Sequence, residues 1–220
     1  MPSSRIIDLR RILAERFPHE PLPQRNDQLS TGLTNFDTAL QGGLTKGAIT
    51  ELTSDRASAG SASLVAALLQ RASKERFFVA LIDGQDSFDP ASVSTRALCH
   101  MLWVRCSSGT EAMQAADLLL RDGNFPLVIL DLMLNSLAEL RKIPSSNWYR
   151  LQRLVEPAPT AFLVLTPRSM ISSAQWKLSL ESHWNLPQLD WATGELQGQL
   201  NFRLQRAQCY QRRREEEVAC

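Results

Sequence analysis

A short segment of this chain lies where a nucleotide-binding loop would be expected. Residues 51–64 read ELTSDRASAGSASL and join a predicted strand at 48–53 to a predicted helix near 61–74. A phosphate-binding loop has the pattern G-x-x-x-x-G-K-[ST]. Its glycines let backbone N–H groups cradle phosphate, its lysine faces the β- and γ-phosphates, and its hydroxyl binds Mg²⁺. Only Gly60 fits that pattern here.

The other positions of the pattern hold residues that cannot do this chemistry. Ser61 takes the place of the lysine, Ala62 takes the place of the hydroxyl, and Ser54 or Asp55 stands where the first glycine belongs. A carboxylate at Asp55 would repel phosphate. We therefore predict that the chain binds no nucleotide cofactor and is not an enzyme.

Three other residues could be metal ligands by type alone. Cys99, His100 and Cys106 lie within eight positions of one another. No fourth ligand is spaced to complete a tetrahedral site, and the cysteines have no C-x-x-C spacing. We predict no metal site, and free thiols in a reducing cytosol.

Bulk composition limits the function classes that remain. The chain has 220 residues, 44% of them hydrophobic and 21% charged, with a formal net charge of +1. This length suits one α/β domain with a small appendage. The near-zero charge gives no global field for nucleic acid, so any such contact would need a local patch. No apolar run is long enough to span a bilayer and the start is not a signal peptide, so we expect a cytoplasmic protein without membrane contact.

Residues 1–29 are predicted to form an amphipathic helix on a tether. The helix has an apolar stripe of Ile6, Leu9, Leu13 and Phe17, and the basic residue Arg10 lies beside it. Pro18, Pro21 and Pro23 then stiffen an extended connection. The stripe could cover this chain's own core or dock on another chain, and both alternatives stay open.

Residues 30–205 are predicted to be a doubly wound α/β core with a mainly parallel sheet. The predicted strands at 77–83, 127–132 and 161–165 contain the continuous apolar runs 77–82, 127–130 and 161–165, which are typical of parallel strands covered on both faces. Further elements are a strand at 101–105 and helices at 110–122 and near 145–155, with Gly123 ending the first helix. Alternation at 178–186 and 196–204, around a turn at Thr193-Gly194, predicts two strands that extend the sheet in antiparallel fashion.

Residues 206–220 are predicted to be a charged tail. Its basic residues are Arg206, Arg212, Arg213 and Arg214, and three glutamates follow them. Such a run is either a solvated end or a surface that binds an acidic segment of a partner.

Several segments in register resemble the RecA-like family. Residues 31–51, TGLTNFDTALQGGLTKGAITE, resemble the segment that leads into that family's phosphate loop, and 81–90, LIDGQDSFDP, resembles its strand end and D-P turn. The runs MLWVR at 101–105, GTEAMQAADLLLRDG at 109–123 and LVILDL at 127–132 are similar to ImuA, a RecA-like accessory protein of bacterial mutagenic translesion synthesis. The resemblance spans roughly residues 30 to 205.

The resemblance also shows where catalytic residues are missing. The acidic residue that positions the attacking water in active members corresponds to Gln85, which has no carboxylate to act as a base. The family's glutamine sensor corresponds to Thr166. Asp131 alone matches a metal-coordinating acidic position, although a polar residue commonly ends a parallel strand. The resemblance therefore implies a pseudo-ATPase.

If nucleotide chemistry is absent, the resemblance implies an adaptor. It would be induced by DNA damage in an SOS-type response and would bind a Y-family-polymerase-like subunit, with RecA or a RecA filament and an error-prone replicative-type polymerase as further partners. The segment from Arg5 to Phe17 occupies the place from which family members contact a neighbouring protomer. Alternatives are a cell-division inhibitor of the SulA type and a nucleotide-binding switch with a divergent loop.

Direct DNA contact is a further hypothesis. The family binds DNA through two loops, which correspond here to residues 133–144, where the pattern favours a helix, and to the short segment 167–175. A weak phosphate track would consist of Arg141, Lys142, Arg150, Arg153 and Arg168. Trp148 and Tyr149 would be stacking platforms, unless Trp148 packs in the core.

Overall fold

The computed structural model describes residues 28–56, 59–184, 191 and 193–207. The predicted N-terminal helix with its residues Ile6, Leu9, Arg10, Leu13 and Phe17 lies outside the described residues. So do Arg212, Arg213 and Arg214 of the predicted tail.

The described residues form a central seven-stranded sheet in the order β5-β4-β6-β7-β3-β8-β9. All neighbours pair in parallel except β9, which is antiparallel to β8. This confirms the predicted mainly parallel α/β fold with an antiparallel extension. The strands are β3 Ala48–Thr53, β4 Val79–Asp83, β5 Met101–Arg105, β6 Leu127–Asp131, β7 Ala161–Thr166, β8 Trp176–Leu180 and β9 Phe202–Ala207.

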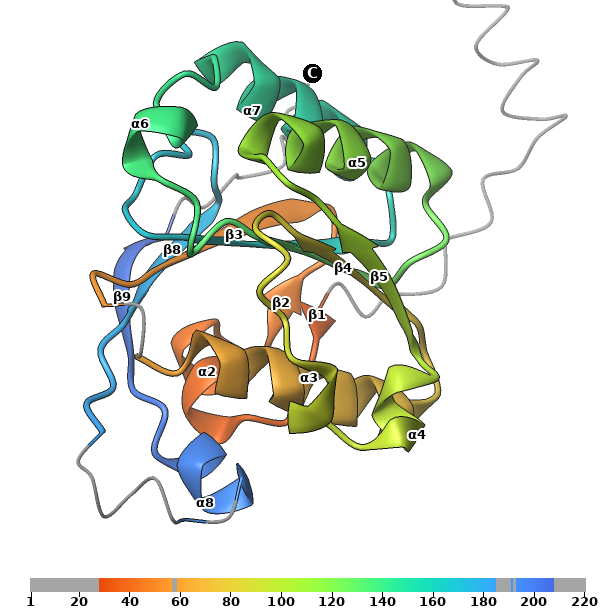
Figure 1. Cartoon of the computed structure of the whole chain (residues 1–220), viewed down its shortest axis with the longest axis vertical. Coiled ribbons are helices and arrows are strands. Elements are labelled where there is room, and N and C mark those ends of the chain that lie inside the picture. Colours follow the sequence, from red (N-terminus) through yellow and green to blue (C-terminus); the bar gives the residue numbers. More distant parts are fainter. Residues whose placement is uncertain (1–27, 57–58, 185–190, 192, 208–220) are drawn as a thin grey trace, which may run out of the picture.

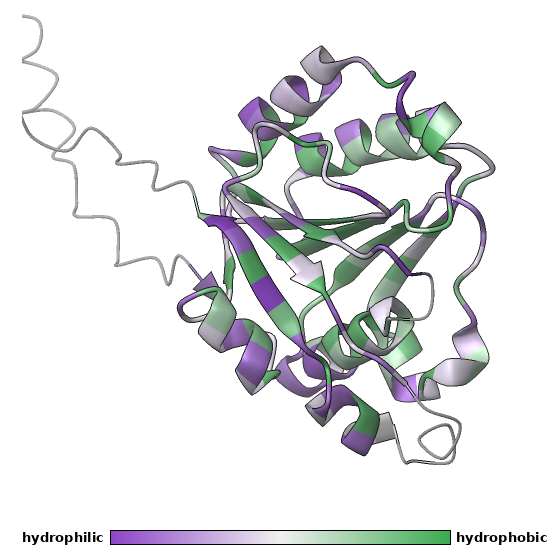
Figure 2. Cartoon of the chain, turned by 90° about the vertical axis from the view of Figure 1, so that its left-hand side faces the viewer, coloured by the Kyte–Doolittle hydropathy of each residue, from purple (hydrophilic) through white to green (hydrophobic). Residues whose placement is uncertain are grey.

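Helices cover both faces of the sheet, as Figure 1 shows. One face carries α5 Gly109–Asp122, α6 Leu137–Leu140 and α7 Ser145–Val155. The other face carries α2 Thr34–Ala39, α3 Ser61–Glu75 and α4 Thr95–Leu98, which follows a 3-10 turn at Pro90–Ser92. Two apolar cores result, one on each face. In Figure 2 the hydrophobic colour concentrates in the strands and on the helix sides that face them.

Local sequence signals explain the ends of α5. Its N-cap Ser108 accepts a hydrogen bond from the Glu111 N–H, and the Glu111 carboxylate accepts one from the Ser107 N–H at 2.8 Å. These contacts hold the pKa of Glu111 below its ordinary value, and the hydrogen bond from the Ser107 N–H is the largest cause. Gly123 ends the helix with φ 68°, as predicted.

The prediction of a strand at 196–204 was wrong in its first half. Thr193–Gly198 forms α8, and only Phe202–Ala207 is a strand. Leu196 and Leu200 are four residues apart, a spacing that fits a helical turn as well as an alternating strand. The helix packs on α3, and the buried Leu200 follows it. The first predicted strand is also shorter, since β8 ends at Leu180.

Residues 28–47 form small elements that the sequence pattern did not reveal. Strands β1 Gln28–Leu29 and β2 Leu44–Thr45 pair in antiparallel fashion, and α2 lies between them in the sequence. The Asp37 carboxylate binds this segment together, because it accepts hydrogen bonds from the Thr31 N–H at 2.9 Å and the Thr31 hydroxyl at 2.6 Å. Within the described part of the chain, no helix is long and apolar enough to cross a membrane.

Candidate functional site at the carboxyl edge of the sheet

Residues 54–56, directly after β3, form a turn held by hydrogen bonds of Ser54. The Ser54 hydroxyl donates to the Arg56 carbonyl at 2.8 Å and accepts from the Arg56 N–H at 3.3 Å. The Ser54 N–H donates to the carbonyl of Thr166 on the neighbouring strand. The Ser54 hydroxyl therefore shapes a turn, and Asp55, the other residue that could match the first glycine of the pattern, is exposed.

The start of α3 is covered by apolar side chains from the far end of the chain. Gly60 is the helix N-cap and has φ 105°. A β-carbon placed there would lie 2.5 Å from Cδ2 of Leu200 and 3.3 Å from Cζ2 of Trp184. Leu200 is 1% exposed. In a working loop, phosphate would sit against these helix N–H groups, so Leu200 and Trp184, here named the apolar cover, restrict the space beside Gly60.

A polar contact fastens the same two segments together. The Arg56 guanidinium donates to Nδ1 of His183 at 2.9 Å, which requires the tautomer with its proton on Nε2. Ser61, in the place of the lysine, is partly buried, and Ala62 is exposed. The two motif positions at the start of α3 therefore lack the lysine and the hydroxyl of the phosphate-loop pattern.

Two aspartates lie opposite each other at the ends of neighbouring strands. Asp83 of β4 is in register with Asp131 of β6. Asp83 is buried and accepts hydrogen bonds from the Phe88 N–H at 2.7 Å and the Ser87 hydroxyl at 3.2 Å. Its role is to hold the turn after β4. Gln85, in that turn, is exposed and reaches Asp83 only through its backbone N–H.

Asp131 is in a different electrostatic position. Within the described residues, its carboxylate accepts a hydrogen bond from the Met133 N–H at 2.9 Å. Burial raises the pKa of Asp131 to about 6; the Met133 hydrogen bond opposes this shift, and the negative charge of Asp83 adds to it. A bound divalent cation would favour the ionised form. The residues around Asp131 supply no such charge.

Thr166, in the place of the family's glutamine sensor, belongs to a buried network around Glu51. Glu51 is fully buried and pairs with Lys177 at 3.0 Å. Its Oε1 also accepts from the N–H groups of Met170 at 2.7 Å and Ile171 at 3.0 Å, and the Thr166 hydroxyl lies 3.4 Å away. The carboxylate is compensated by a cation and by hydrogen bonds, as a buried charge requires.

This network fixes the segment 167–175 to the sheet. Lys177 donates to the Ser169 hydroxyl at 2.9 Å, and that hydroxyl donates to Glu51 at 3.1 Å. The segment was predicted as a DNA-binding loop, and the structure gives it four hydrogen bonds to one buried ion pair. The sequence signal was available: a glutamate and a lysine each interrupt an apolar strand, and buried charges need partners.

The predicted DNA-binding residues lie at the end of α6, on α7 and in the segment after β7. Arg141, Lys142, Arg153 and Arg168 are exposed. Arg150 is exposed too, and it pairs with Asp117 at 2.7 Å. Trp148 is 3% exposed and packs in the core, so the prediction of a stacking platform there was wrong. Tyr149 is 50% exposed, and its hydroxyl accepts from Ser172.

The remaining candidates are not brought together. Arg206 is exposed on β9, away from the phosphate-loop position. Cys99 is exposed and Cys106 is buried, and burial raises the pKa of the Cys106 thiol. The His100 ring stacks on Phe78. Among the described side chains, no three of His, Cys, Asp and Glu gather as a metal site.

Comparison with known proteins places these observations in a family. The description "RecA N-terminal domain" matches residues 20–143. RecA of Rickettsia bellii is 31% identical over 108 residues, which are 48% of this chain and 31% of that protein. RecA of Nostoc sp. is 28% identical over 109 residues, and RecA of Rhodopirellula baltica is 32% identical over 108. The matched segment spans about a third of the length of these relatives.

Proposed function

Because the chain belongs to the RecA N-terminal domain family, we propose that it is a non-catalytic, ImuA-type adaptor of damage-induced mutagenic translesion synthesis. It acts in the cytoplasm and joins a Y-family-polymerase-like subunit to RecA or a RecA filament, next to an error-prone replicative-type polymerase. It uses the fold of an ATPase as a scaffold for partners.

One observation carries the proposal: the apolar cover on Gly60. Leu200 and Trp184 lie against the helix start where a nucleotide's phosphates would need backbone N–H groups. The loop also lacks the lysine and the Mg²⁺ hydroxyl, and each such group contributes several kcal/mol to phosphate binding or transfer in a working site. A loop that lacks these two groups, at a helix start covered by apolar side chains, favours a function other than nucleotide hydrolysis.

The exposed apolar side chains suit an interaction protein. At the β5 end of the sheet, Leu102 is 40% exposed on β5, Phe78 is 55% exposed beside β4, and Leu118 is 69% exposed on α5. Within the described residues β5 pairs on one side only, so its outer backbone groups are open to another strand. Apolar side chains beside an open sheet edge are typical of a surface that binds protein.

Nucleotide binding is the first test. Equilibrium dialysis with labelled ATP and Mg²⁺ should show no binding in the micromolar range, with RecA as the positive control. The double substitution Ser61→Lys with Ala62→Thr restores the missing groups. We expect it to remain without binding, and to gain affinity only when Leu200→Ala is added. Micromolar binding by the unmodified chain would leave the nucleotide-switch alternative standing.

Partner capture is the second test. The tagged chain is recovered from its native host after DNA damage, and bound proteins are identified by mass spectrometry. Recovery of a Y-family-polymerase-like protein or RecA is the expected result. Recovery of a tubulin-like division protein instead would favour the SulA-type alternative. Leu102→Glu tests the β5 edge, and Leu204→Glu is its matched control, because Leu204 is 41% exposed on the opposite edge strand.

A further inference from the structure

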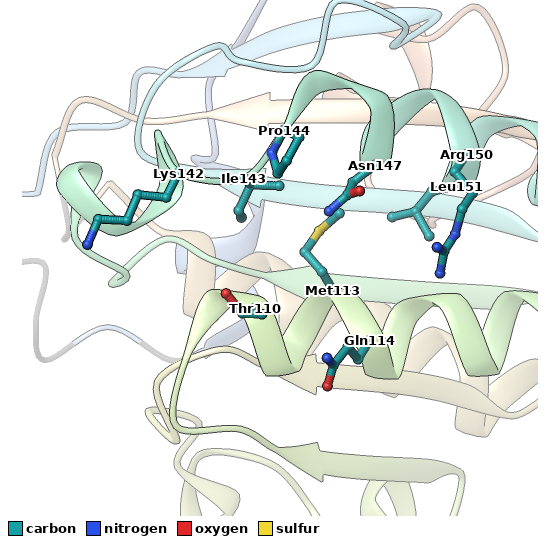
Figure 3. Close-up of a pocket in the computed structure, with 9 residues that line it drawn as sticks. All are labelled: Thr110, Met113, Gln114, Lys142, Ile143, Pro144, Asn147, Arg150 and Leu151. Atoms are coloured by element: carbon teal, nitrogen blue, oxygen red, sulfur yellow. The ribbon is translucent and has the colours of Figure 1, made fainter.

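A pocket of about 370 Å³ lies between α5 and α7, on the sheet face opposite α3. Figure 3 shows Met113 rising from α5 between the two helices, with Asn147 of α7 facing it and Arg150 extending from α7 toward α5. Met113 and Leu151 are buried and form the apolar part of the lining. The rest of the lining is Thr110, Gln114, Lys142, Ile143, Pro144, Asn147 and Arg150.

The charged residues that line this pocket are both cations. Within the described residues Lys142 forms no ion pair, and it lies at the end of the pocket near α6. Arg150 shares the carboxylate of Asp117 with Arg121, at 2.7 Å and 2.9 Å, so two cations face one anion. No acidic residue occupies the first turn of α7, and its N-cap, Pro144, makes no side-chain cap. The partial positive charge of that helix end therefore adds to the cations.

The nearby carboxylates are already engaged. Glu139 accepts from the Gly109 N–H at the start of α5 and from the Asn135 amide. Glu111 accepts from the N–H and the hydroxyl of Ser107, at 2.8 Å and 2.9 Å. These acids satisfy the start of α5. Neither acid lines the pocket, whose charged lining residues are Lys142 and Arg150.

We propose that this pocket docks a short acidic segment of a partner protein, with one large apolar side chain of that segment inserted between α5 and α7. The insert contacts Met113 and Leu151, and its flanking carboxylates face Lys142, Arg150 and the start of α7. This proposal specifies one binding site of the proposed adaptor. It rests on the adaptor function for one point, that the ligand is a partner protein.

Shape favours a peptide over nucleic acid as the occupant. The volume is near the lower end of the roughly 300–1,000 Å³ of small-ligand pockets, and its floor is apolar. A phosphate backbone needs a track of cations and exposed aromatic platforms. Trp148 is buried and cannot stack on a base, and the exposed Tyr149 does not line the pocket. An apolar floor with a cationic rim instead matches an aromatic or leucine side chain between glutamates.

The test measures fluorescence polarisation of a labelled peptide that has one central phenylalanine between glutamates. Two control peptides carry a central alanine, or lysines in place of the glutamates. We expect the first peptide to bind with a Kd on the order of 10–100 μM at low salt, and the controls to bind at least about tenfold more weakly. Added salt should weaken the binding, because the charges at the rim are exposed.

Two variants of the full chain locate the binding. Lys142→Glu should lower the affinity about fivefold or more, while Lys74→Glu should not change it. Lys74 is exposed on α3, on the other face of the sheet, so it matches the charge change without touching the pocket. Gln114→Trp, at an exposed position on the lining, should block the insert by filling space. Unchanged circular dichroism shows that each variant is folded.

Three results would overturn the proposal. The first is equal binding of the phenylalanine and alanine peptides, and the second is an equal effect of Lys142→Glu and Lys74→Glu on peptide affinity. The third is that the chain binds labelled oligothymidylate and not the peptide, and that Lys142→Glu abolishes this binding. The last would assign the rim to nucleic acid. Partner capture from the host is independent of these outcomes. Peptide binding without polymerase or RecA recovery would refute the adaptor function alone, and the reverse would refute the pocket alone.

Discussion

Asp131 gives a quantitative prediction about the carboxyl edge of the sheet. Its pKa in the folded chain is about 6, against an ordinary value of 3.8, mainly because burial disfavours the charged form. A raised folded pKa means that the native state binds more protons than the unfolded state between about pH 4 and pH 6. Stability contributed by the protonated form is therefore present at low pH and lost as pH rises through that window.

The magnitude follows from the size of the shift. About two pH units correspond to about 3 kcal/mol between the two ends of the window. Asp131→Asn mimics the protonated form, and its side-chain oxygen can still accept from the Met133 N–H. We expect the variant and the unmodified chain to have similar free energies of unfolding near pH 4. The variant should be about 3 kcal/mol more stable at pH 8.

Urea unfolding followed by far-ultraviolet circular dichroism, from pH 4 to pH 8, measures this difference. The two proteins share their other titrating groups. One of these is Asp117: burial raises its pKa, but hydrogen bonds from two arginines lower it more, so the pKa lies below its ordinary value. Their effects largely cancel in the comparison. A difference that is the same at pH 4 and pH 8 would show that burial does not penalise the Asp131 charge. Adding Mg²⁺ and ATP should leave the profile unchanged, because we expect neither to bind. A bound cation would instead stabilise the ionised carboxylate of the unmodified chain and remove the stability advantage of the variant.

Other predictions concern the buried ion pair and the start of α3. Lys177→Met leaves a buried carboxylate without its cation and should lower the free energy of unfolding by about 3–5 kcal/mol, whereas Lys74→Met on the surface should change it by less than about 0.5 kcal/mol. Gly60→Ala combines a left-handed φ with a contact of 2.5 Å to Leu200 and should cost about 2–5 kcal/mol. Gly123→Ala, where nothing lies within 4 Å, isolates the φ effect and should cost about 1 kcal/mol. Urea denaturation of the four variants checks all three statements, and equal losses at the two glycines would contradict the packing argument.

The parallel core could be predicted because its signals are local. Strands such as 127–131 and 161–166 are continuous apolar runs, and Gly123 marks a helix end by its own backbone preference. The order of the strands and the small elements at 28–47 are not local properties. They depend on contacts such as Asp37 with Thr31, which sequence spacing does not reveal.

The region after residue 180 was predicted less well, for a physical reason. Alternation of apolar residues fits a strand, but two leucines four apart also fit a helix, and packing against α3 decided between them. The buried pair of Glu51 and Lys177 joins positions 126 residues apart, so its existence could be suspected from charge in an apolar strand but its geometry could not.

Gly60 shows how a motif residue can be explained without the motif's chemistry. It is the one residue that fits the phosphate-loop pattern, which by itself would favour nucleotide binding. In the structure its φ of 105° is one that residues with a side chain rarely adopt, and a β-carbon there would lie 2.5 Å from Leu200 and 3.3 Å from Trp184. Backbone geometry and packing therefore require glycine at this position whether or not phosphate ever binds. The match at Gly60 is thus no evidence for nucleotide binding, while the side chains that cover it are evidence against it.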